Sequence, residues 1–489
     1  MTEQKMEQLK SFRLRRKRTI HIIIVELIII SMLGISYWVL HSMGFIAVSG
    51  YQRDADTSME DNDDTEEDYT GTGETDAGNN LPTPEEQALL KEKERLQQQE
   101  QERLELIAEA EYMAKGYYYD SAIELIKSYE GPEGSSYEAY IPLVTEVRKL
   151  EEEKDQLVLY GGEYDSVTQI NHIFFHSLIA EPEKAFDGDY DSKGYNMYMV
   201  TVGEFDTMIQ KLYDDGYVLV NMSDIAQQIT TDDGKEKYVP GEIWLLPGKK
   251  PLVLSVDDVS YYEYMDNDGF PSRIIIGADG KPTCEMLQED GSTTVGAYDV
   301  VPILDAFVEE HPDFSYKGAK GLLALTGYQG VLGYRTNDTA SATYEEDKAA
   351  AITVAEALKA EGWEFASHSW GHKNVQKQSL AAFRQDTERW LSEVGPLIGP
   401  TPFYVFPFGV DIETTVGHYK SEKYEFLKEN GFHFFMGVYK EPWMQIRDDY
   451  VRMTRRAVDG QALLQFPERL ADLFDIKETI DPGRPPRNW

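Results

Sequence analysis

Four residues of this chain have the types and spacing needed to bind a catalytic metal ion. Asp257 and Asp258 follow the apolar run PLVLSV, and His368 and His372 stand four positions apart in FASHSWGH. Two histidines one turn apart can bind one face of a divalent cation. One carboxylate then completes a three-ligand site with a position open for water, whose pKa the metal lowers. The single cysteine, Cys284, excludes a Cys-rich zinc site, so the ligands must be histidines and carboxylates.

Short apolar runs separated by amphipathic helices follow Gly161, and this alternation predicts an α/β domain with a mostly parallel sheet. The expected strands lie in the runs 170–178, 217–222, 251–258, 321–327, 363–369, 401–409, 433–438 and 450–458. In a barrel of such strands the active site lies at the carboxyl ends. The Asp pair, the His pair and the sequence Pro407-Phe408-Gly409 all stand at such ends.

These three signatures, in this order and spacing, resemble the polysaccharide deacetylase family, also called NodB homology or carbohydrate esterase family 4, over about residues 165–470. The resemblance implies a distorted (β/α) barrel of NodB type over residues 161–489. It also implies metal-dependent removal of N-acetyl groups from a polysaccharide. By the same resemblance Asp257 is the general base, and Asp258, His368 and His372 bind one divalent metal. Zn²⁺ is the expected ion, with Co²⁺ or Ni²⁺ as alternatives.

The general acid departs from the common family pattern, which places it in a Leu-His-Asp signature on a late strand. The histidines after Phe408 are His418 and His433, and neither has such a context. The run NHIFFHSL resembles instead the first strand of the circularly permuted branch, which acts on poly-N-acetylglucosamine. That resemblance implies that His176 is the acid, a role a histidine can fill at neutral pH. His172 is interpreted as a packing residue.

Two further positions differ from the family pattern. Val259 replaces the glycine that follows the Asp pair, and the arginine that precedes the Pro-aromatic-Gly motif is absent. In the family that arginine orients the base. Its role could pass to one of three other residues, between which the sequence does not choose: Arg335, Arg455 and Arg456.

Several residues are candidates for contact with substrate. The backbone around Pro407, Phe408 and Gly409 could bind the substrate carbonyl or the oxyanion. Tyr261 and Trp370 could stack on sugar rings, as could Tyr262 and Trp443, although packing roles explain each of them equally well. An insertion over residues 264–295 contains a predicted hairpin and is expected at the rim of the cleft.

The N-terminus has the features of a membrane anchor. Residues 1–19 form a basic tail. Residues 20–48 are mostly apolar, with Glu26 as their only charged residue, and this segment is long enough to span a bilayer. The basic flank predicts a cytoplasmic N-terminus, so the protein is expected to be a single-pass cell-membrane protein with its C-terminal domain extracellular. A cleaved signal peptide and a buried helix are the alternatives.

Two segments are expected to separate the anchor from the α/β domain. Residues 49–82 are acidic and lack apolar side chains for a core, which predicts a disordered linker. Residues 83–160 predict a helical stalk that begins at Thr83 and Pro84, contains one tetratricopeptide-like hairpin and ends with a third helix over 136–157. A spacing or packing role, self-association through the stalk and peptide binding all remain open.

The overall charge limits the possible partners. The chain of 489 residues has 47 basic and 87 acidic side chains, a formal net charge of −40, so nucleic acid is an unfavourable partner. A polysaccharide substrate and a membrane are the expected partners. The leading function is N-deacetylation of an extracellular or cell-wall glycan that contains N-acetylglucosamine. The alternatives are glycan O-deacetylation, or a degenerate barrel that binds a glycan or a protein without catalysis.

Overall fold

The computed structural model describes residues 83–160, 169–414, 417–487 and 489. The predicted anchor and acidic linker therefore lie outside the described residues. In the described part of the chain, no helix combines the length and the apolar character needed to cross a membrane. The chain divides into two compact units, residues 1–98 and 99–489.

The first described helix, α2 (Pro84–Lys115), begins where the sequence predicts a helix start. The Glu86 amide donates to Thr83 Oγ1 at 3.2 Å, and the Thr83 amide donates to Glu86 Oε2 at 2.8 Å. This reciprocal pair is a capping box, which satisfies two backbone donors that the first turn leaves without partners. Pro84 fits the first turn because the missing N–H has no role there.

Two further helices follow α2, namely α3 (Tyr119–Lys127) and α4 (Ile141–Lys154). The small residues Ala110 and Ala122 are fully buried, as is Leu143 on α4. The third helix is shorter than the predicted 136–157. Its first turn contains Pro142, which is tolerated only near a helix start, and residues before it form short 3₁₀ turns.

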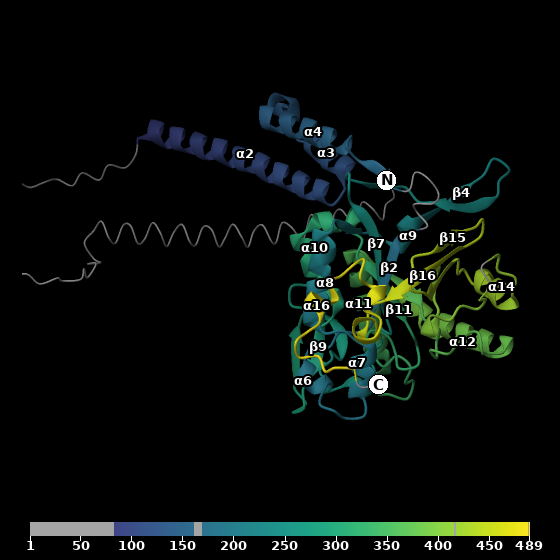
Figure 1. The fold of residues 1–489 in the computed structure, drawn as a ribbon. Coiled ribbons are helices and arrows are strands. Elements are labelled where there is room, and N and C mark those ends of the chain that lie inside the picture. Colours follow the sequence, from purple (N-terminus) through teal and green to yellow (C-terminus); the bar gives the residue numbers. More distant parts are fainter. Residues whose placement is uncertain (1–82, 161–168, 415–416, 488) are drawn as a thin grey trace, which may run out of the picture. The chain divides into compact units, whose positions relative to one another are not determined.

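A closed parallel barrel forms the centre of the second unit (Figure 1). Its seven described strands are β2 (Asn171–Phe175), β7 (Lys250–Asp257), β11 (Gly321–Leu325), β12 (Trp363–Ser367), β13 (Phe403–Val405), β14 (Phe434–Val438) and β16 (Val451–Ala457). They pair in chain order, and the pairing of β16 with β2 closes the ring. Most of their residues are buried, as expected for parallel strands that have the barrel interior on one face and helices on the other.

The eight predicted runs all contain a strand. Seven of these strands form the closed ring, and the one in run 217–222, β3 (Tyr217–Leu219), pairs with β7 outside it. The helices around the barrel are α6 (Pro182–Ala185), α7 (Ser192–Tyr198), α8 (Val202–Asp214), α9 (Met222–Ile225), α10 (Val300–Glu310), α11 (Tyr344–Glu361), α12 (Leu380–Glu393), α13 (Gly395–Ile398), α14 (Glu422–Glu429), α15 (Gly460–Leu464) and α16 (Ile476–Thr479). This order matches a (β/α) barrel.

Antiparallel strands form additional small sheets and one extra pairing beside the barrel strands. The insertion after β7 forms a three-stranded sheet of β8 (Arg273–Ile276), β9 (Pro282–Leu287) and β10 (Thr293–Gly296), so the predicted hairpin gains a third strand. The remaining strands are β1 (Val158–Tyr160) with β6 (Ile243–Leu245), β4 (Ala226–Thr230) with β5 (Glu236–Pro240), and β15 (Met444–Ile446) against β16. Short 3₁₀ turns are η1 (Pro132–Gly134), η2 (Tyr137–Ala139), η3 (Glu263–Met265), η4 (Pro312–Phe314), η5 (Tyr316–Gly318), η6 (Pro407–Gly409) and η7 (Pro467–Arg469).

Candidate metal centre

Three of the predicted site residues meet at the carboxyl ends of β7 and β12. Asp258 follows β7, while His368 and His372 lie on the loop after β12, and one donor atom from each lies within 4.8 Å of the others. His372 Nε2 is 3.8 Å from Asp258 Oδ2. Parallel strands bring their carboxyl ends to the same edge of a barrel, which explains why residues so distant in the sequence converge.

The loops that carry these residues have unusual backbone angles. Asp258, Ser369, His372 and Phe408 have φ values of 58°, 57°, 48° and 59°, in the left-handed region that L-residues rarely adopt. Each such residue costs on the order of 1 kcal/mol. They cluster at one end of the barrel. This indicates that the rest of the fold offsets the backbone strain that orients these side chains toward the site.

Asp386 on α12 holds the loop between the two histidines. Its carboxylate accepts hydrogen bonds from the amides of Trp370 at 2.9 Å and Gly371 at 3.0 Å. The two histidines are thereby fixed relative to each other. Sequence reasoning missed Asp386, because no local pattern connects an acid in an amphipathic helix with a loop that precedes it.

The surroundings of His368 suit a metal ligand. Its Nδ1 lies 2.9 Å from the Val405 carbonyl, so Nδ1 carries the proton and Nε2 keeps a free lone pair. Burial lowers the pKa of His368 to about 4, so the imidazole is neutral at physiological pH. A neutral imidazole is the form that binds metals. Two imidazoles and one carboxylate are also the donor set expected for zinc, so the residues present fit such an ion.

Asp258 is held by a neighbour that the sequence did not assign to this task. The Tyr262 hydroxyl donates to Asp258 Oδ1 at 2.7 Å. Burial opposes ionisation, but His372 and the hydrogen bond from the Tyr262 hydroxyl lower the pKa of Asp258 below its ordinary value. Asp258 is therefore a carboxylate near neutral pH, as a ligand must be.

Asp257 points to a different partner from Asp258. Arg455 on β16 donates to Oδ1 of Asp257 at 2.6 Å and to Oδ2 at 2.9 Å, and both side chains are buried. Asp257 Oδ2 also lies 3.9 Å from His368 Nε2. Burial raises the pKa of Asp257, but the charge of Arg455 and its two hydrogen bonds outweigh burial and lower that pKa well below the ordinary range. Asp257 is thus a buried, ionised carboxylate at the edge of the histidine cluster.

Of the three candidate arginines, Arg455 is the one that contacts Asp257. Arg455 pairs with Asp257, and its guanidinium lies 4.2 Å from the ring centroid of Phe174. Arg335 instead donates to the carbonyls of Ser260, Gln329 and Tyr261, and Arg456 pairs with Asp472. Arg455 therefore orients the predicted base.

His176 stands just after β2, close to both aspartates. Its charge, when protonated, lowers the pKa of Asp257 and of Asp258, which places it within electrostatic reach of the cluster. Its Nδ1 lies 3.1 Å from the Tyr198 carbonyl, so Nδ1 donates there and Nε2 is left for other partners. His172 is buried and bonds to Ser255 Oγ at 2.9 Å, in agreement with its interpretation as a packing residue.

The Pro407-Phe408-Gly409 turn borders the centre. The Phe408 ring is 64% exposed, and its centroid lies 4.5 Å from that of His372. The Gly409 amide donates to the Phe406 carbonyl at 2.9 Å, which removes it as a donor to an oxyanion. The Phe408 amide has no hydrogen-bond partner among residues 83–160, 169–414 and 417–487, so it replaces Gly409 as the candidate donor.

The two predicted sugar-stacking residues differ in exposure, and burial contradicts the prediction for Tyr261. Tyr261 is buried, and its hydroxyl donates to Asp299 Oδ2 at 2.8 Å, because the chain turns inward at this residue with a φ of 50°. Trp370 donates from Nε1 to Glu393 at 2.8 Å, and Arg389 covers its ring at 3.3 Å from the centroid. The Tyr261 ring is therefore closed to a sugar, whereas Trp370 is half-buried with Arg389 over its ring.

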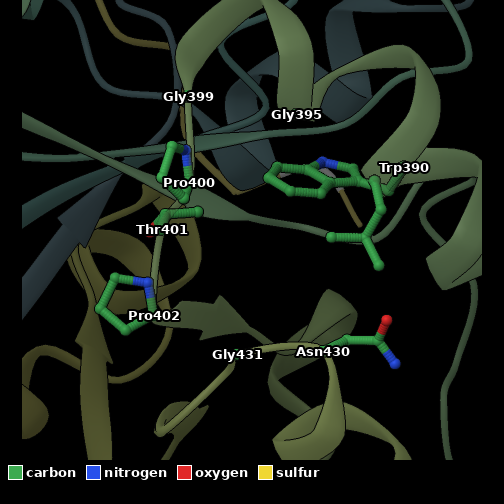
Figure 2. Close-up of a pocket in the computed structure, with 9 residues that line it drawn as sticks. Trp390, Gly395, Gly399, Pro400, Thr401, Pro402, Asn430 and Gly431 are labelled. Atoms are coloured by element: carbon green, nitrogen blue, oxygen red, sulfur yellow. The ribbon is translucent and has the colours of Figure 1, made fainter.

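A cavity of about 470 Å³ lies elsewhere on the barrel (Figure 2). Trp390, Pro400, Thr401, Pro402 and Asn430 are among its lining residues. Pro402 stands directly before β13, so the cavity belongs to the amino end of the strands, opposite the metal cluster. Its lining residues include no titratable side chain, which separates this cavity from the candidate site.

Two solved structures share similarity with this chain at low sequence identity. No protein-family profile and no curated protein matches the chain. The Streptococcus pyogenes deacetylase PplD, solved in complex with acetate, is 12% identical over 63% of this chain and 98% of its own, with a TM-score of 0.35. BA0330 of Bacillus anthracis, described as a polysaccharide deacetylase, is 12% identical over 62% of this chain and 68% of its own, with a TM-score of 0.34. At these scores the similarity to the two structures supports no functional conclusion.

Proposed function

We propose that this protein is a metal-dependent hydrolase that removes N-acetyl groups from a glycan containing N-acetylglucosamine. One observation carries the proposal: Asp258, His368 and His372 converge on one point, with the Arg455-bound carboxylate of Asp257 beside them. Three ligands that leave a coordination position open are typical of catalytic rather than structural metal sites. The motif resemblance supplies the substrate class.

Each residue has a distinct task in this proposal. A divalent ion held by Asp258, His368 and His372 would polarise the acetyl carbonyl and make a water acidic. Asp257 remains ionised and would accept a proton from the water whose oxygen attacks the acetyl carbon. Its oxygens keep further lone pairs although Arg455 donates to both. The Phe408 amide donates to the oxygen that becomes negative, and His176 donates a proton to the departing sugar nitrogen.

The identity of Arg455 also bears on the alternative of a non-catalytic binding module. That alternative draws its support from the missing motif arginine. Arg455 reaches the base from β16 and orients it through two hydrogen bonds, which supports its taking the role of the missing residue. A binding module has no use for an oriented, ionised carboxylate beside a metal cluster, so this contact favours an enzyme.

The cellular setting is part of the proposal. Residues 20–48 would anchor the chain in the cell membrane with the catalytic domain outside, where the glycan is accessible. The acidic linker and the helical stalk would then set the distance between the membrane and the barrel. Self-association of the stalk is compatible with this arrangement.

Acetate release tests the proposed activity. The full-length protein is stripped of metal and given Zn²⁺, Co²⁺ or Ni²⁺ in turn, and acetate released from chitooligosaccharides and from peptidoglycan is measured. His372→Ala serves as a matched variant that lacks one ligand. We expect metal-dependent release by the wild type and none by the variant. Stoichiometric metal binding without acetate release from either glycan would contradict the assignment.

A further inference from the structure

The hydroxyl of Tyr262 contacts one oxygen of the candidate ligand Asp258. It donates to Oδ1 at 2.7 Å, and it lies 3.3 Å from Thr326 Oγ1. The other oxygen, Oδ2, faces His372 Nε2 at 3.8 Å. The two oxygens of Asp258 therefore have different surroundings, one engaged by a phenol and one directed at the histidines.

This asymmetry has a consequence for metal binding. A carboxylate can bind a cation through one oxygen or through both. The Tyr262 hydroxyl is the donor in its hydrogen bond to Asp258 Oδ1. This hydrogen bond occupies a lone pair of Oδ1 and makes Oδ1 a weaker ligand for a metal ion. Oδ2 is then the oxygen directed at the ion. Partners of this kind fix the orientation of a ligand before the metal arrives.

The Tyr262 ring is held firmly enough for such a task. It is buried, and it stacks against Tyr264 and against Tyr328, with ring centroids 5.6 Å and 5.2 Å apart and interplanar angles of 19° and 29°. Arg335 ties down the backbone just before it, by donating to the Ser260 and Tyr261 carbonyls at 3.2 and 2.6 Å. The hydroxyl therefore has little freedom to leave Asp258.

We propose that Tyr262 is a positioning residue that holds Asp258 as a one-oxygen ligand and thereby raises the affinity and fixes the geometry of the metal site. The inference rests on the metal centre of the proposed function and deepens it, since neither the sequence motif nor its resemblance assigns Tyr262 such a part. It concerns binding rather than turnover, so it can be tested without a substrate.

The test compares Tyr262→Phe with Tyr264→Phe in the full-length protein. Both variants lose one hydroxyl from the same aromatic stack, but Tyr264 has no hydrogen bond to Asp258 and its ring is 50% exposed. Zn²⁺ affinity is measured by competition with a chromophoric chelator, and the visible absorption spectrum is recorded with Co²⁺ bound. Thermal unfolding of the metal-free proteins shows whether each variant folds.

We expect Tyr262→Phe to bind Zn²⁺ about 10- to 100-fold more weakly than the wild type, the usual range for loss of such a partner, and to show an altered Co²⁺ spectrum. Tyr264→Phe should match the wild type in both. Equal affinity of Tyr262→Phe and wild type would overturn the inference while leaving the metal centre intact. An equal loss in both variants would assign the effect to the stack and would also overturn it. Failure of the wild type to bind any of these ions would remove the metal centre and with it the proposed function.

Discussion

Arg455 donates two hydrogen bonds to Asp257, one to each carboxylate oxygen, although the two residues lie on strands far apart in the sequence. Those strands, β16 and β7, are both neighbours of β2, so closure of the ring brings the last barrel strand to the Asp pair. A planar guanidinium matches a carboxylate in this bidentate geometry, which fixes the orientation of Asp257 as well as its charge.

Replacing Arg455 should expose the energetic coupling within the pair. Arg455→Met leaves a buried carboxylate without its partner, so we expect the free energy of unfolding to fall by about 3–5 kcal/mol. Adding Asp257→Asn removes the unpaired charge and should recover part of that loss. Urea unfolding of the metal-free single and double variants measures the coupling. Additive losses would mean that the pair contributes no interaction energy.

The two adjacent aspartates should have separable roles. Asp257→Asn removes the proton acceptor but leaves the three ligands, so metal should stay bound while turnover falls by about 10²-fold or more. Asp258→Asn should lose both metal and activity. Metal content and acetate release are measured on both variants in parallel. Loss of metal from Asp257→Asn together with its retention in Asp258→Asn would reverse the assignment.

His176 should affect turnover without affecting the metal. His176→Gln removes the proton donor for the leaving nitrogen, and we expect acetate release to fall by about 10²-fold while one metal ion stays bound. His433→Gln is a suitable control, since His433 precedes β14 at the opposite end of the strands and bonds to the Asp449 carbonyl. If His176→Gln retains wild-type turnover, another group donates the proton.

Asp299 should make stability depend on pH. Burial raises its pKa to about 6, although the amides of Leu178 and Val300 and the Tyr261 hydroxyl oppose this by donating to it. The pKa of Asp299 in the folded protein lies above its unfolded value of about 3.9. The contribution of Asp299 to the free energy of unfolding is therefore fully present below pH 4 and is lost as the pH rises to 6. Asp299→Asn keeps the helix cap without the charge. Its unfolding free energy relative to wild type should rise by on the order of 2–3 kcal/mol between pH 4 and pH 7.

Urea unfolding of both proteins across this pH range checks that prediction. Only the difference between the two proteins is informative, since other carboxylates with lowered pKa values, such as Asp257, change stability in the opposite direction. A difference that stays constant with pH would show that Asp299 titrates alike in the folded and unfolded chains.

The proposed topology predicts where added protease acts. Residues 50–80 would be exposed outside the cell, so protease added to intact cells should release a fragment that contains the barrel. The apolar segment 20–48 would hold the remainder in the membrane. Immunoblotting of the medium and of the cell fraction follows both products. If only broken cells yield the fragment, the catalytic domain faces the cytoplasm.

Local patterns in the sequence were sufficient to predict the strands and the meeting of the Asp pair with the His pair, whereas the choice of Asp258 as the ligand came from the family resemblance. Apolar runs of strand length mark β7 and β12, and polar residues directly after each run must reach the carboxyl edge, whatever the rest of the fold does. The Asp pair and the His pair are therefore predictable as neighbours from residue order alone. The helix start at Thr83 is equally local, since a capping box lies within one turn.

Tertiary structure alone decided which neighbours surround those ligands. The sequence does not distinguish Arg335, Arg455 and Arg456 as partners of Asp257. Only closure of the barrel through β16 brings one of them, Arg455, to Asp257. Tyr261 and Tyr262 are adjacent and identical in type, yet the left-handed turn at Tyr261 sends its hydroxyl to Asp299 and that of Tyr262 to Asp258. Motif spacing determines which residues reach the edge of the barrel, but the direction of each side chain there depends on backbone angles and packing partners that are distant in sequence.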